Sequence, residues 1–434
     1  MKKLIPTKFI LLYHYLEAVV ATILYGFPSR KMIVIGVTGT KGKTSAINFI
    51  WSTLSAGGFK VGIISTANIR IGTEERLNKY HMTMPGPFVI QKVMAEMVKA
   101  GCDYCIVETT SEGIKQYRHS GIYYDIAVFT NLSPEHLQSH GGSFQRYKET
   151  KGKMFKALGE HPKILGDKKV EKVIIANSDS EHADYFLGFK ADEKITFGIT
   201  NPANNRAKEI SENQNGVGFT LDGIRFDLSI MGAFNVYNAL PAIIIAKLAG
   251  VNNEMIAQGL HTLSVIPGRM EKINDEQNFT VIVDYAHERE SITGVLTTAK
   301  NMKESAAKII ILLGAEGGGR DKAKRPIMGE LGAKMADYLI VTNVDPYEDD
   351  PQEILEDIAK PAEEFGKVRE KDLFVIEDRR LGIAKALSLA GANDIVLITG
   401  KGAEQSIVIG GVSSPWDDRE VVREELKKRL AKVI

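Results

Sequence analysis

The segment that most constrains the fold of this chain is a glycine-rich run between a predicted strand and a predicted helix. Residues 36–45 read Gly-Val-Thr-Gly-Thr-Lys-Gly-Lys-Thr-Ser. They follow a strand-like apolar run at residues 32–37 and lead into a helical pattern at residues 44–55. In this context glycines let backbone N–H groups close around phosphate oxygens, and the helix N-terminus adds favourable partial charge. The run therefore predicts a phosphate-binding loop.

Single residues of this loop can be given roles. Lys43 would reach the β and γ phosphates of a nucleotide, and the Thr44 hydroxyl would bind Mg²⁺. The usual spacing G-x-x-x-x-G-K-[ST] places glycine at position 37, where this chain has Val37, so the loop is a variant framed by Gly39 and Gly42. The alternative is a glycine-rich turn that binds no nucleotide. The residues predicted to bind ATP here are Gly39, Thr40, Lys41, Gly42, Lys43, Thr44 and Ser45.

Apolar strand-like runs alternate with helical patterns along the chain. Strand–helix alternation is typical of a mainly parallel sheet covered on both faces. Residues 190–230 differ, because they look like short antiparallel strands joined by Asn/Gly turns. Near Val265 the pattern restarts after Pro267 and Gly268, which break the preceding helix. The strand-like runs after the first one are residues 61–65, 103–107, 125–130, 173–176, 280–283, 308–313, 338–342, 373–376 and 394–399.

These patterns predict an α/β protein of three parts. The chain has 434 residues, too many for one ordinary domain. Residues 1–31 form an apolar helical segment, and residues 32–265 form a central ATP-binding domain with a parallel sheet of the P-loop ATPase type. Residues 266–434 form a Rossmann-like α/β domain at the C-terminus.

Composition narrows the possible partners. The net charge is +1, so no overall field draws the chain to nucleic acid. The only cysteines, Cys102 and Cys105, lie three apart in an apparent strand and are too few for a zinc site or a disulfide framework. We interpret them as core thiols of a cytoplasmic protein.

The N-terminal segment is mostly apolar and has basic flanks. Residues 9–27 follow Lys2, Lys3 and Lys8, and His14 and Glu17 interrupt the apolar run. Three interpretations are open: a helix packed on this protein or on a protein partner, a peripheral membrane helix, and a true membrane span or signal. Residues 9–25 are therefore a predicted contact region for a protein partner or a membrane surface.

Further short motifs follow the loop in chain order, and together they carry a resemblance to a known family. They lie at residues 107–111, 129–137, 140–141, 147–155, 232–239, 267–271, 284–287, 320–326, 401–404 and 417–420. This series resembles the Mur ligases and the related folylpolyglutamate synthetases over about residues 32–434. Within the family the resemblance is greatest to the MurE type, which adds the third residue of the peptidoglycan stem.

The resemblance implies an activity. Mur ligases transfer the γ-phosphoryl group of ATP to a carboxylate, and an amine then attacks the acyl phosphate to form an amide. The expected cofactors are ATP and two Mg²⁺ ions, and the expected substrates are a muramyl-peptide-like acceptor and an amino acid. The alternatives are a ligase for folate or another poly-amino-acid substrate, and a non-catalytic ATP-binding subunit of a complex.

The resemblance also implies metal ligands. Glu108 ends a strand and would bind Mg²⁺ together with Thr44, and His136 would bind the second ion. Lys151 matches the family's lysine that is carbamylated, which would turn a repelled ammonium into an anionic ligand. The plainer alternatives are a solvated acid at Glu108, a loop histidine at His136 and an exposed helix lysine at Lys151. His140 is as easily structural as functional.

Four residues match family contacts to ATP. Asn235 and Asn238 lie three apart, on one face of a helix start, and would contact the adenine side. Arg269 would reach the phosphates, and Asp284 would accept hydrogen bonds from the ribose. A surface ion pair between Arg269 and Asp284 is the alternative. Lys43, Lys151, His136 and Arg269 are the predicted catalytic residues.

Several segments depart from the family pattern. About thirty residues precede the loop, fewer than the family's UDP-binding domain needs, so we do not expect UDP binding of the family type. Glu112 replaces a histidine, Tyr347 stands where diaminopimelate enzymes have arginine, and Ala403 replaces the histidine before Glu404. The amino acid that is added therefore stays open. The predicted contacts to acceptor and amino acid are Thr83, Ser111, Gln116, Arg118, Asp345 and Glu404.

Overall fold

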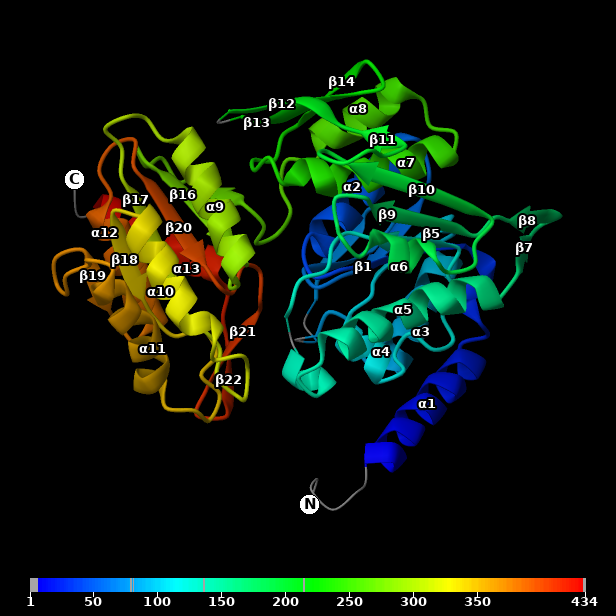
Figure 1. Cartoon of the computed structure of the whole chain (residues 1–434), viewed down its shortest axis with the longest axis horizontal. Helices are drawn as coiled ribbons and strands as arrows, with labels where there is room; N and C mark the ends of the chain where they lie inside the picture. The colour runs from blue at the N-terminus through cyan, green and yellow to red at the C-terminus, as the bar shows by residue number, and fades with distance from the viewer. Residues whose placement is uncertain (1–6, 79, 81, 136, 214, 432–434) are drawn as a thin grey trace. The chain divides into compact units, whose positions relative to one another are not determined.

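The computed structural model describes residues 7–431 except residues 79, 81, 136 and 214. The chain forms two compact units, each described here by itself (Figure 1). The first unit comprises Met1–Ser211, Val217–Ser229 and Phe234–Ser264. The second comprises Glu212–Gly216, Ile230–Ala233 and Val265–Ile434.

A sheet that has nine strands among the described residues forms the centre of the first unit. Its strands in spatial order are β11 (Asn205–Arg206), β10 (Glu193–Gly198), β9 (Val173–Asn177), β6 (Ile126–Phe129), β1 (Ile33–Thr38), β5 (Tyr104–Glu108), β2 (Val61–Ile64), β3 (Asn68–Ile71) and β4 (Glu74–Leu77). All neighbouring strands pair in parallel except at the β2–β3 and β3–β4 edge. The predicted mainly parallel sheet is confirmed, and β1, which leads into the glycine-rich loop, lies between β5 and β6.

Helices complete the first unit, and several pack against the sheet. They are α1 (Thr7–Leu24), α2 (Lys43–Ala56), α3 (Pro87–Lys99), α4 (Ser111–Lys115), α5 (Phe144–Glu160), α6 (Ala183–Leu187), α7 (Asn235–Leu248) and α8 (Asn253–Thr262), with the 3₁₀ turns η2 (Pro28–Lys31) and η3 (Leu137–His140). Side chains of α3, α5 and α6 join one buried apolar cluster with the strands. α2 contacts β2 and β5, and it packs on α7 and α8.

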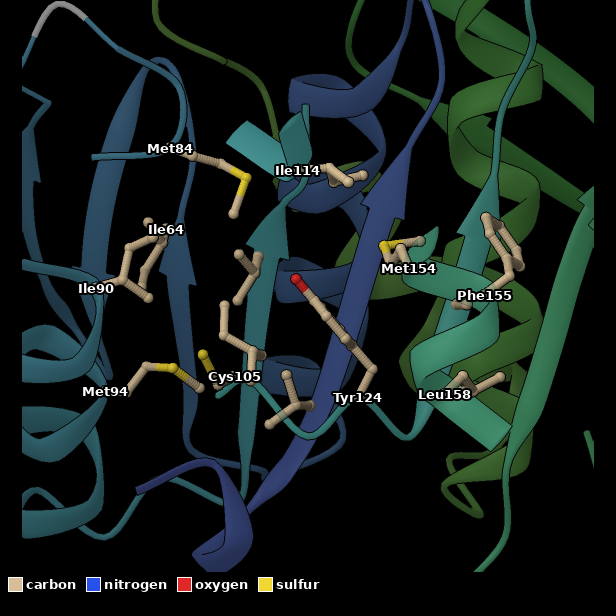
Figure 2. Packing of buried hydrophobic residues seen from close by; sticks show 14 of the residues in the cluster. Ile64, Met84, Ile90, Met94, Cys105, Ile114, Tyr124, Met154, Phe155 and Leu158 are labelled. Atoms are coloured by element: carbon tan, nitrogen blue, oxygen red, sulfur yellow. The ribbon is translucent and has the colours of Figure 1, made fainter. Parts of the chain in front are cut away.

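Gly36 shows why the strand before the loop needs a glycine. A Cβ at Gly36 would lie 2.7 Å from the Tyr124 ring and 2.8 Å from the sulfur of Met154. Figure 2 shows the Tyr124 side chain between Cys105 and Met154, crossing β1 within the buried cluster. A larger residue at position 36 would displace these side chains, so the position that opens the motif is fixed by core packing.

The predicted antiparallel strands between residues 190 and 230 are partly wrong. β10 pairs in parallel with β9, and β11 pairs in parallel with β10, so both extend the central sheet. β13 (Gly216–Leu221) and β14 (Ile224–Leu228) do pair antiparallel, and they form a small separate sheet with β12 (Lys208–Asn213). The apolar pattern of a strand does not specify its partner, which is why the first two strands were assigned wrongly.

A buried ionic cluster lies where β6 begins. Asp125 is fully buried, and its carboxylate accepts hydrogen bonds from Val34 N and from Lys172 Nζ, each at 2.8 Å. Lys163 in the hairpin of β7 (Lys163–Leu165) and β8 (Lys168–Val170) also bonds to Asp125 and donates to the carbonyl oxygens of Ser29 and Met32. The cluster therefore ties this hairpin to β1 and β6.

The second unit is built on a sheet that has six strands among the described residues. Their order is β15 (Glu271–Ile273), β16 (Thr280–Asp284), β20 (Ile395–Thr399), β17 (Ile309–Leu313), β18 (Tyr338–Val341) and β19 (Leu373–Val375). Only β15 is antiparallel to its neighbour. The remaining elements are α9 (Arg289–Met302), α10 (Lys324–Met335), α11 (Pro351–Glu364), α12 (Arg379–Leu389), α13 (Asp418–Ala431) and the hairpin of β21 (Ser406–Ile409) and β22 (Val412–Pro415). A parallel sheet with intervening helices is the predicted α/β arrangement.

The two cysteines lie near the start of β5, and the apolar N-terminal segment forms α1. Cys102 and Cys105 are both free and buried, as expected, but Cys102 lies in the turn before β5 and not inside the strand. Within the described part of the chain, α1 and the other helices fall short of the length and apolar character that crossing a membrane requires.

Candidate active site

The glycine-rich loop runs from the end of β1 to the start of α2, at the carboxyl edge of the parallel strands. Two of its glycines have positive φ angles, 153° at Gly39 and 79° at Gly42. A Cβ at Gly39 would lie 2.0 Å from Thr130 Oγ1, and one at Gly42 would lie 2.1 Å from Asn238 Oδ1. Both positions therefore require glycine for conformation and for space.

The chain after β6 holds the loop in place through hydrogen bonds to backbone atoms of the loop. Thr40 N donates to the Asn131 carbonyl oxygen and Lys41 N donates to Asn131 Oδ1, both at 2.9 Å. Thr130 Oγ1 donates to the Lys41 carbonyl oxygen at 2.7 Å. The Thr-Asn pair belongs to one of the sequence motifs, but sequence reasoning gave it no role. Its position after a strand adjacent to β1 was the available signal.

The lysines of the loop have partners within the first unit. Lys43 Nζ donates to the Thr40 carbonyl oxygen at 2.9 Å. Lys41 Nζ lies 3.0 Å from the buried carboxylate of Glu135. The loop thus has one ammonium folded back over its own backbone and a second one neutralised by an acid.

Thr44 and Glu108 come together, as the sequence predicted. The Thr44 hydroxyl donates to Glu108 Oε2 at 3.0 Å, and Thr66 N donates to the same oxygen at 2.8 Å. Glu108 is 2% exposed, so it is not a solvated strand-end acid. A buried hydroxyl at the start of α2 and a buried carboxylate at the end of β5 suit a hard cation such as Mg²⁺. Among the described residues, no group of three or more His, Cys, Asp and Glu side chains is arranged to hold a metal ion.

Lys151 lies beneath the loop and is not an exposed helix lysine. It is on α5, is 2% exposed, and donates from Nζ to the Gly39 carbonyl oxygen at 2.9 Å. The ammonium also lies 4.7 Å from the centre of the Tyr147 ring. Burial, followed by the nearby Lys43 charge, lowers the pKa of Lys151 well below its usual value. A larger fraction of Lys151 is therefore present as the neutral amine than for an exposed lysine.

Two histidines, His136 and His140, precede α5 in the sequence. His136 lies outside the described residues. His140 is buried, and its Nδ1 lies 3.5 Å from the Thr150 hydroxyl. Burial, with a contribution from Lys115, lowers the pKa of His140. His140 packs beside Tyr147, and the Tyr147 hydroxyl lies 3.2 Å from Thr40 Oγ1. Tyr147 therefore lies between His140 and the loop.

Asn235 and Asn238 share one face at the start of α7, as predicted. Asn238 Nδ2 donates to Asn235 Oδ1 at 2.8 Å, and both side chains are buried. The close approach of Asn238 to Gly42 places this pair next to the phosphate loop. The structure thus brings both asparagines to the loop, while their assignment to the adenine side stays a prediction.

Most of the predicted acceptor contacts in the first unit are held by hydrogen bonds. Thr66 Oγ1 donates to Thr83 Oγ1 at 2.8 Å. Because Thr66 N also donates to Glu108, Thr66 links Thr83 to that carboxylate. Arg118 donates to Gln116 Oε1 at 2.6 Å and to the Met84 carbonyl oxygen. Ser111 is buried at the start of α4. These side chains lie around the loops that follow β2 and β5.

Arg269 and Asp284 are organised separately within the second unit. Asp284 is buried and accepts hydrogen bonds from Met270 N and Ala286 N, both at 2.7 Å. The Arg269 guanidinium stacks over the Tyr285 ring, 4.4 Å from its centre. Burial raises the pKa of Asp284. Asp284 is therefore not merely the acid of a surface ion pair. It is buried, and its two backbone hydrogen bonds fix the turn after β16.

Asp345 and Glu404 are joined by a residue that sequence reasoning did not single out. Lys401 is fully buried, and its Nζ lies 2.8 Å from Asp345 Oδ2 and 2.7 Å from Glu404 Oε2. Glu404 also accepts a hydrogen bond from the Tyr285 hydroxyl at 3.0 Å. Burial opposes ionisation of the neighbouring Glu316, but the charges of His287 and nearby cations lower its pKa to about 2. Because Lys401 pairs with its carboxylate, Glu404 already has one ammonium partner within the chain.

Comparison with known protein families matches both units. Residues 37–246 match the Mur ligase middle domain, and residues 268–402 match the domain described as "Mur ligase, glutamate ligase domain".

Individual relatives extend the likeness over nearly the whole chain. A UDP-N-acetylmuramoyl-L-alanyl-D-glutamate–2,6-diaminopimelate ligase of Bacillus cereus is 36% identical over 417 residues, covering 95% of this chain and 82% of the relative. A UDP-N-acetylmuramyl-tripeptide synthetase of Roseiflexus is 34% identical, covering 94% and 81%.

Solved structures give the same picture. The structure of a UDP-N-acetylmuramoyl-L-alanyl-D-glutamate–2,6-diaminopimelate ligase superposes with a TM-score of 0.61 and 28% identity, covering 92% of this chain and 79% of that one. A Mycobacterium tuberculosis folylpolyglutamate synthase with ADP has a TM-score of 0.71 at 17% identity, covering 98% and 97%, which is a likeness of fold.

Proposed function

This chain belongs to the Mur ligase family, and from that premise we propose that it adds an amino acid to a muramyl-peptide-like acceptor in peptidoglycan synthesis, driven by ATP. The observation that carries the proposal is the group of buried polar residues around the phosphate loop. Thr44 and Glu108 form its cation-binding pair, and Lys151 lies directly under Gly39.

The reaction requires activation because a carboxylate and an amine do not condense in water. A carboxylate oxygen of the acceptor attacks the γ-phosphorus of ATP, and the bond to the β–γ bridging oxygen breaks, giving an acyl phosphate and ADP. The amine then attacks the acyl carbon and loses a proton, and the tetrahedral intermediate expels phosphate to leave the amide. Negative charge gathers on the phosphoryl group, so the site must supply positive charge and N–H donors there.

The residues around the loop suit these demands. Backbone N–H groups of the loop and the N-terminus of α2 would receive the phosphates, and Lys43 would leave the Thr40 carbonyl to bind their oxygens. Bound Mg²⁺ would neutralise phosphate charge, with Thr44 and Glu108 as its protein ligands. The pair is buried, which strengthens its interaction with a cation.

Lys151 is proposed to act as a carbamate. Among the described residues, its Nζ donates to the Gly39 carbonyl oxygen rather than to an acid, and its depressed pKa favours the neutral amine that attacks CO₂. The amine nitrogen would bond to the carbon of CO₂ and release a proton, giving an anion with two oxygens. Such an anion suits a second Mg²⁺, for which His136 is the other proposed ligand.

The second unit would supply the remaining contacts. Arg269 is proposed to bind phosphate oxygens and Asp284 the ribose, while Asn235 and Asn238 of the first unit contact the adenine side. Thr83, Ser111, Gln116 and Arg118 are proposed to bind the acceptor. Asp345 and Glu404 are proposed to bind the amino acid, with Lys401 controlling how much of their charge is available.

A phosphate-release assay with a panel of acceptors and amines tests this proposal. Turnover of ATP only when UDP-muramyl dipeptide and an amino acid are both present would support it. Turnover with a pteroylglutamate in place of the muramyl acceptor would instead identify a folylpolyglutamate-type ligase. Nucleotide binding without turnover under any acceptor would identify a non-catalytic subunit and overturn the proposal.

A further inference from the structure

Helix α1 has two apolar faces, and only one of them packs on the protein. Ala18, Ala21 and Thr22 are buried against the first unit, where α1 contacts α3. The opposite face exposes seven large apolar or aromatic side chains, each between 51% and 68% accessible. They are Phe9, Leu12, Tyr13, Leu16, Val20, Ile23 and Leu24.

These seven side chains form one continuous stripe. Their spacings of one, three and four residues place them within about 120° around a helix with 3.6 residues per turn. The stripe runs along the whole helix, and Figure 1 shows the N-terminal half of α1, in blue, extending past α3 and α4. Scattered exposed apolar side chains are ordinary, but a contiguous stripe marks an interaction surface.

The polar residues of α1 lie to the side of this stripe. His14 and Glu17, which interrupt the apolar run in the sequence, are 28% and 26% exposed and face each other at 3.2 Å. The Glu17 carboxylate lies beside the stripe, within hydrogen-bond distance of the His14 ring, and does not break it. No acidic side chain within the described part of α1 other than Glu17 opposes an anionic partner.

Charge is concentrated in the same segment. Residues 1–31 have a net charge of +4 while the whole chain carries only +1, so the remainder is acidic overall. The charged residues of this segment are Lys2, Lys3, Lys8, Glu17, Arg30 and Lys31. A second copy of this chain placed on the stripe would bring two segments of like charge together, which is unfavourable. An anionic lipid surface is complementary to both the apolar stripe and the basic flanks.

We propose that α1 docks this protein on an anionic lipid surface. The helix lies in the plane of the interface, with the stripe inserted at the boundary between headgroups and acyl chains, and the net positive charge of residues 1–31 attracts the anionic headgroups. Tyr13 and Phe9 occupy the boundary, where aromatic rings are favoured. This inference does not depend on the ligase activity, because it concerns a face remote from the phosphate loop in sequence.

Docking would also place two of the proposed acceptor contacts, Gln116 and Arg118, near the lipid. The Tyr15 ring packs edge-on against Tyr117 at 5.5 Å, and Thr22 packs so closely on Gly121 that a Cβ there would lie 1.9 Å from its hydroxyl. Gln116 and Arg118, which are proposed to bind the acceptor, are the chain neighbours of Tyr117. A helix fixed on a surface would thus hold these residues close to that surface.

Vesicle co-sedimentation of the full chain, without nucleotide, tests the proposal. We expect the protein to sediment with vesicles that contain phosphatidylglycerol and to stay in solution with pure phosphatidylcholine vesicles. The double variant Leu16→Gln/Ile23→Gln should reduce the partition coefficient at least about tenfold. Replacing Lys2, Lys3 and Lys8 by glutamine should reduce it about fivefold per charge, and added salt should have a similar effect.

A matched variant controls for the general loss of apolar surface. Ile164 and Leu381 are 69% and 60% exposed and lie outside α1, so Ile164→Gln/Leu381→Gln should bind vesicles as the wild type does. Unchanged unfolding temperatures would show that each variant is folded. Wild-type protein that does not bind phosphatidylglycerol vesicles would overturn the proposal. So would equal binding by the α1 variant, or a dimer that Leu16→Gln/Ile23→Gln dissociates.

Discussion

The Thr44 hydroxyl donates a hydrogen bond of 3.0 Å to the Glu108 carboxylate, which joins the first turn of α2 to the end of β5. The two residues are 64 positions apart in the chain, and the parallel pairing of β1 with β5 brings them together. The strand order of the sheet therefore determines the position of the two proposed cation ligands.

Glu108→Gln should remove the negative charge of this pair with little change in shape. We expect kcat to fall about a hundredfold and the Mg²⁺ concentration for half-maximal rate to rise, because the amide binds a cation weakly. A Mg²⁺ titration of ATP turnover measures both effects. Glu149→Gln, on the exposed side of α5, is the matched control and should behave as wild type. An unaltered Mg²⁺ dependence in Glu108→Gln would remove Glu108 from the cation site.

Lys151→Ala should abolish most of the activity if the carbamate is required. Acetate or another small carboxylate should restore part of the rate, because it can occupy the space and supply anionic oxygens. Lys153→Ala, an exposed lysine two positions along the same helix, should keep full activity. Activity of wild-type enzyme should also fall when CO₂ and bicarbonate are removed. Full turnover by unrescued Lys151→Ala would show that no carbamate is needed.

Gly42→Ala should weaken nucleotide binding more than tenfold, as measured by calorimetry. The added methyl group would meet Asn238 Oδ1 at 2.1 Å, at a position where φ is +79°. Gly58→Ala separates the two causes, because Gly58 has a φ of +88° but no atom within 4 Å of a new Cβ. Gly58→Ala should lower stability by about 1 kcal/mol and leave nucleotide affinity unchanged. Equal affinities for all three proteins would argue against close packing of Asn238 on the loop.

Asp125→Asn should destabilise the first unit by about 3–5 kcal/mol, because Lys163 and Lys172 would lose their buried counter-charge. Denaturant unfolding measures the change. The exposed pair of Asp222 and Lys247 gives the comparison, since Asp222→Asn should cost about 0–1 kcal/mol. A small effect at Asp125 would mean that water or a lowered lysine pKa relieves the two ammonium groups.

Sequence patterns predicted the layers and the loop well, because both depend on local features. Apolar runs placed most strands within a residue or two, and the glycine spacing located the loop between β1 and α2. They did not predict the pairing of β10 and β11, which join the central sheet in parallel beside β9. The periodicity of a single strand does not show which neighbour it pairs with or in which direction.

The site was predicted unevenly for a similar reason. Motif positions identified Thr44, Glu108 and Lys151, but they could not show that Lys151 is buried against a carbonyl oxygen or that Asn131 supports the loop. Lys401 was given no role because its role comes from two ion pairs that form in the folded chain. One partner, Asp345, is distant in sequence, and the other, Glu404, is three residues away. Burial of a charged residue is a tertiary property, so composition and spacing do not reveal it.

The hydrogen bonds from Thr130 and Asn131 to the glycine-rich loop have a thermodynamic consequence. They fix Thr40 and Lys41 in the conformation that would surround a phosphate before any ligand arrives. Much of the backbone conformational entropy of this loop is therefore lost during folding and need not be lost again on association. Asn131→Ala should then weaken nucleotide binding mainly through a less favourable entropy change, with the contacts to the ligand preserved.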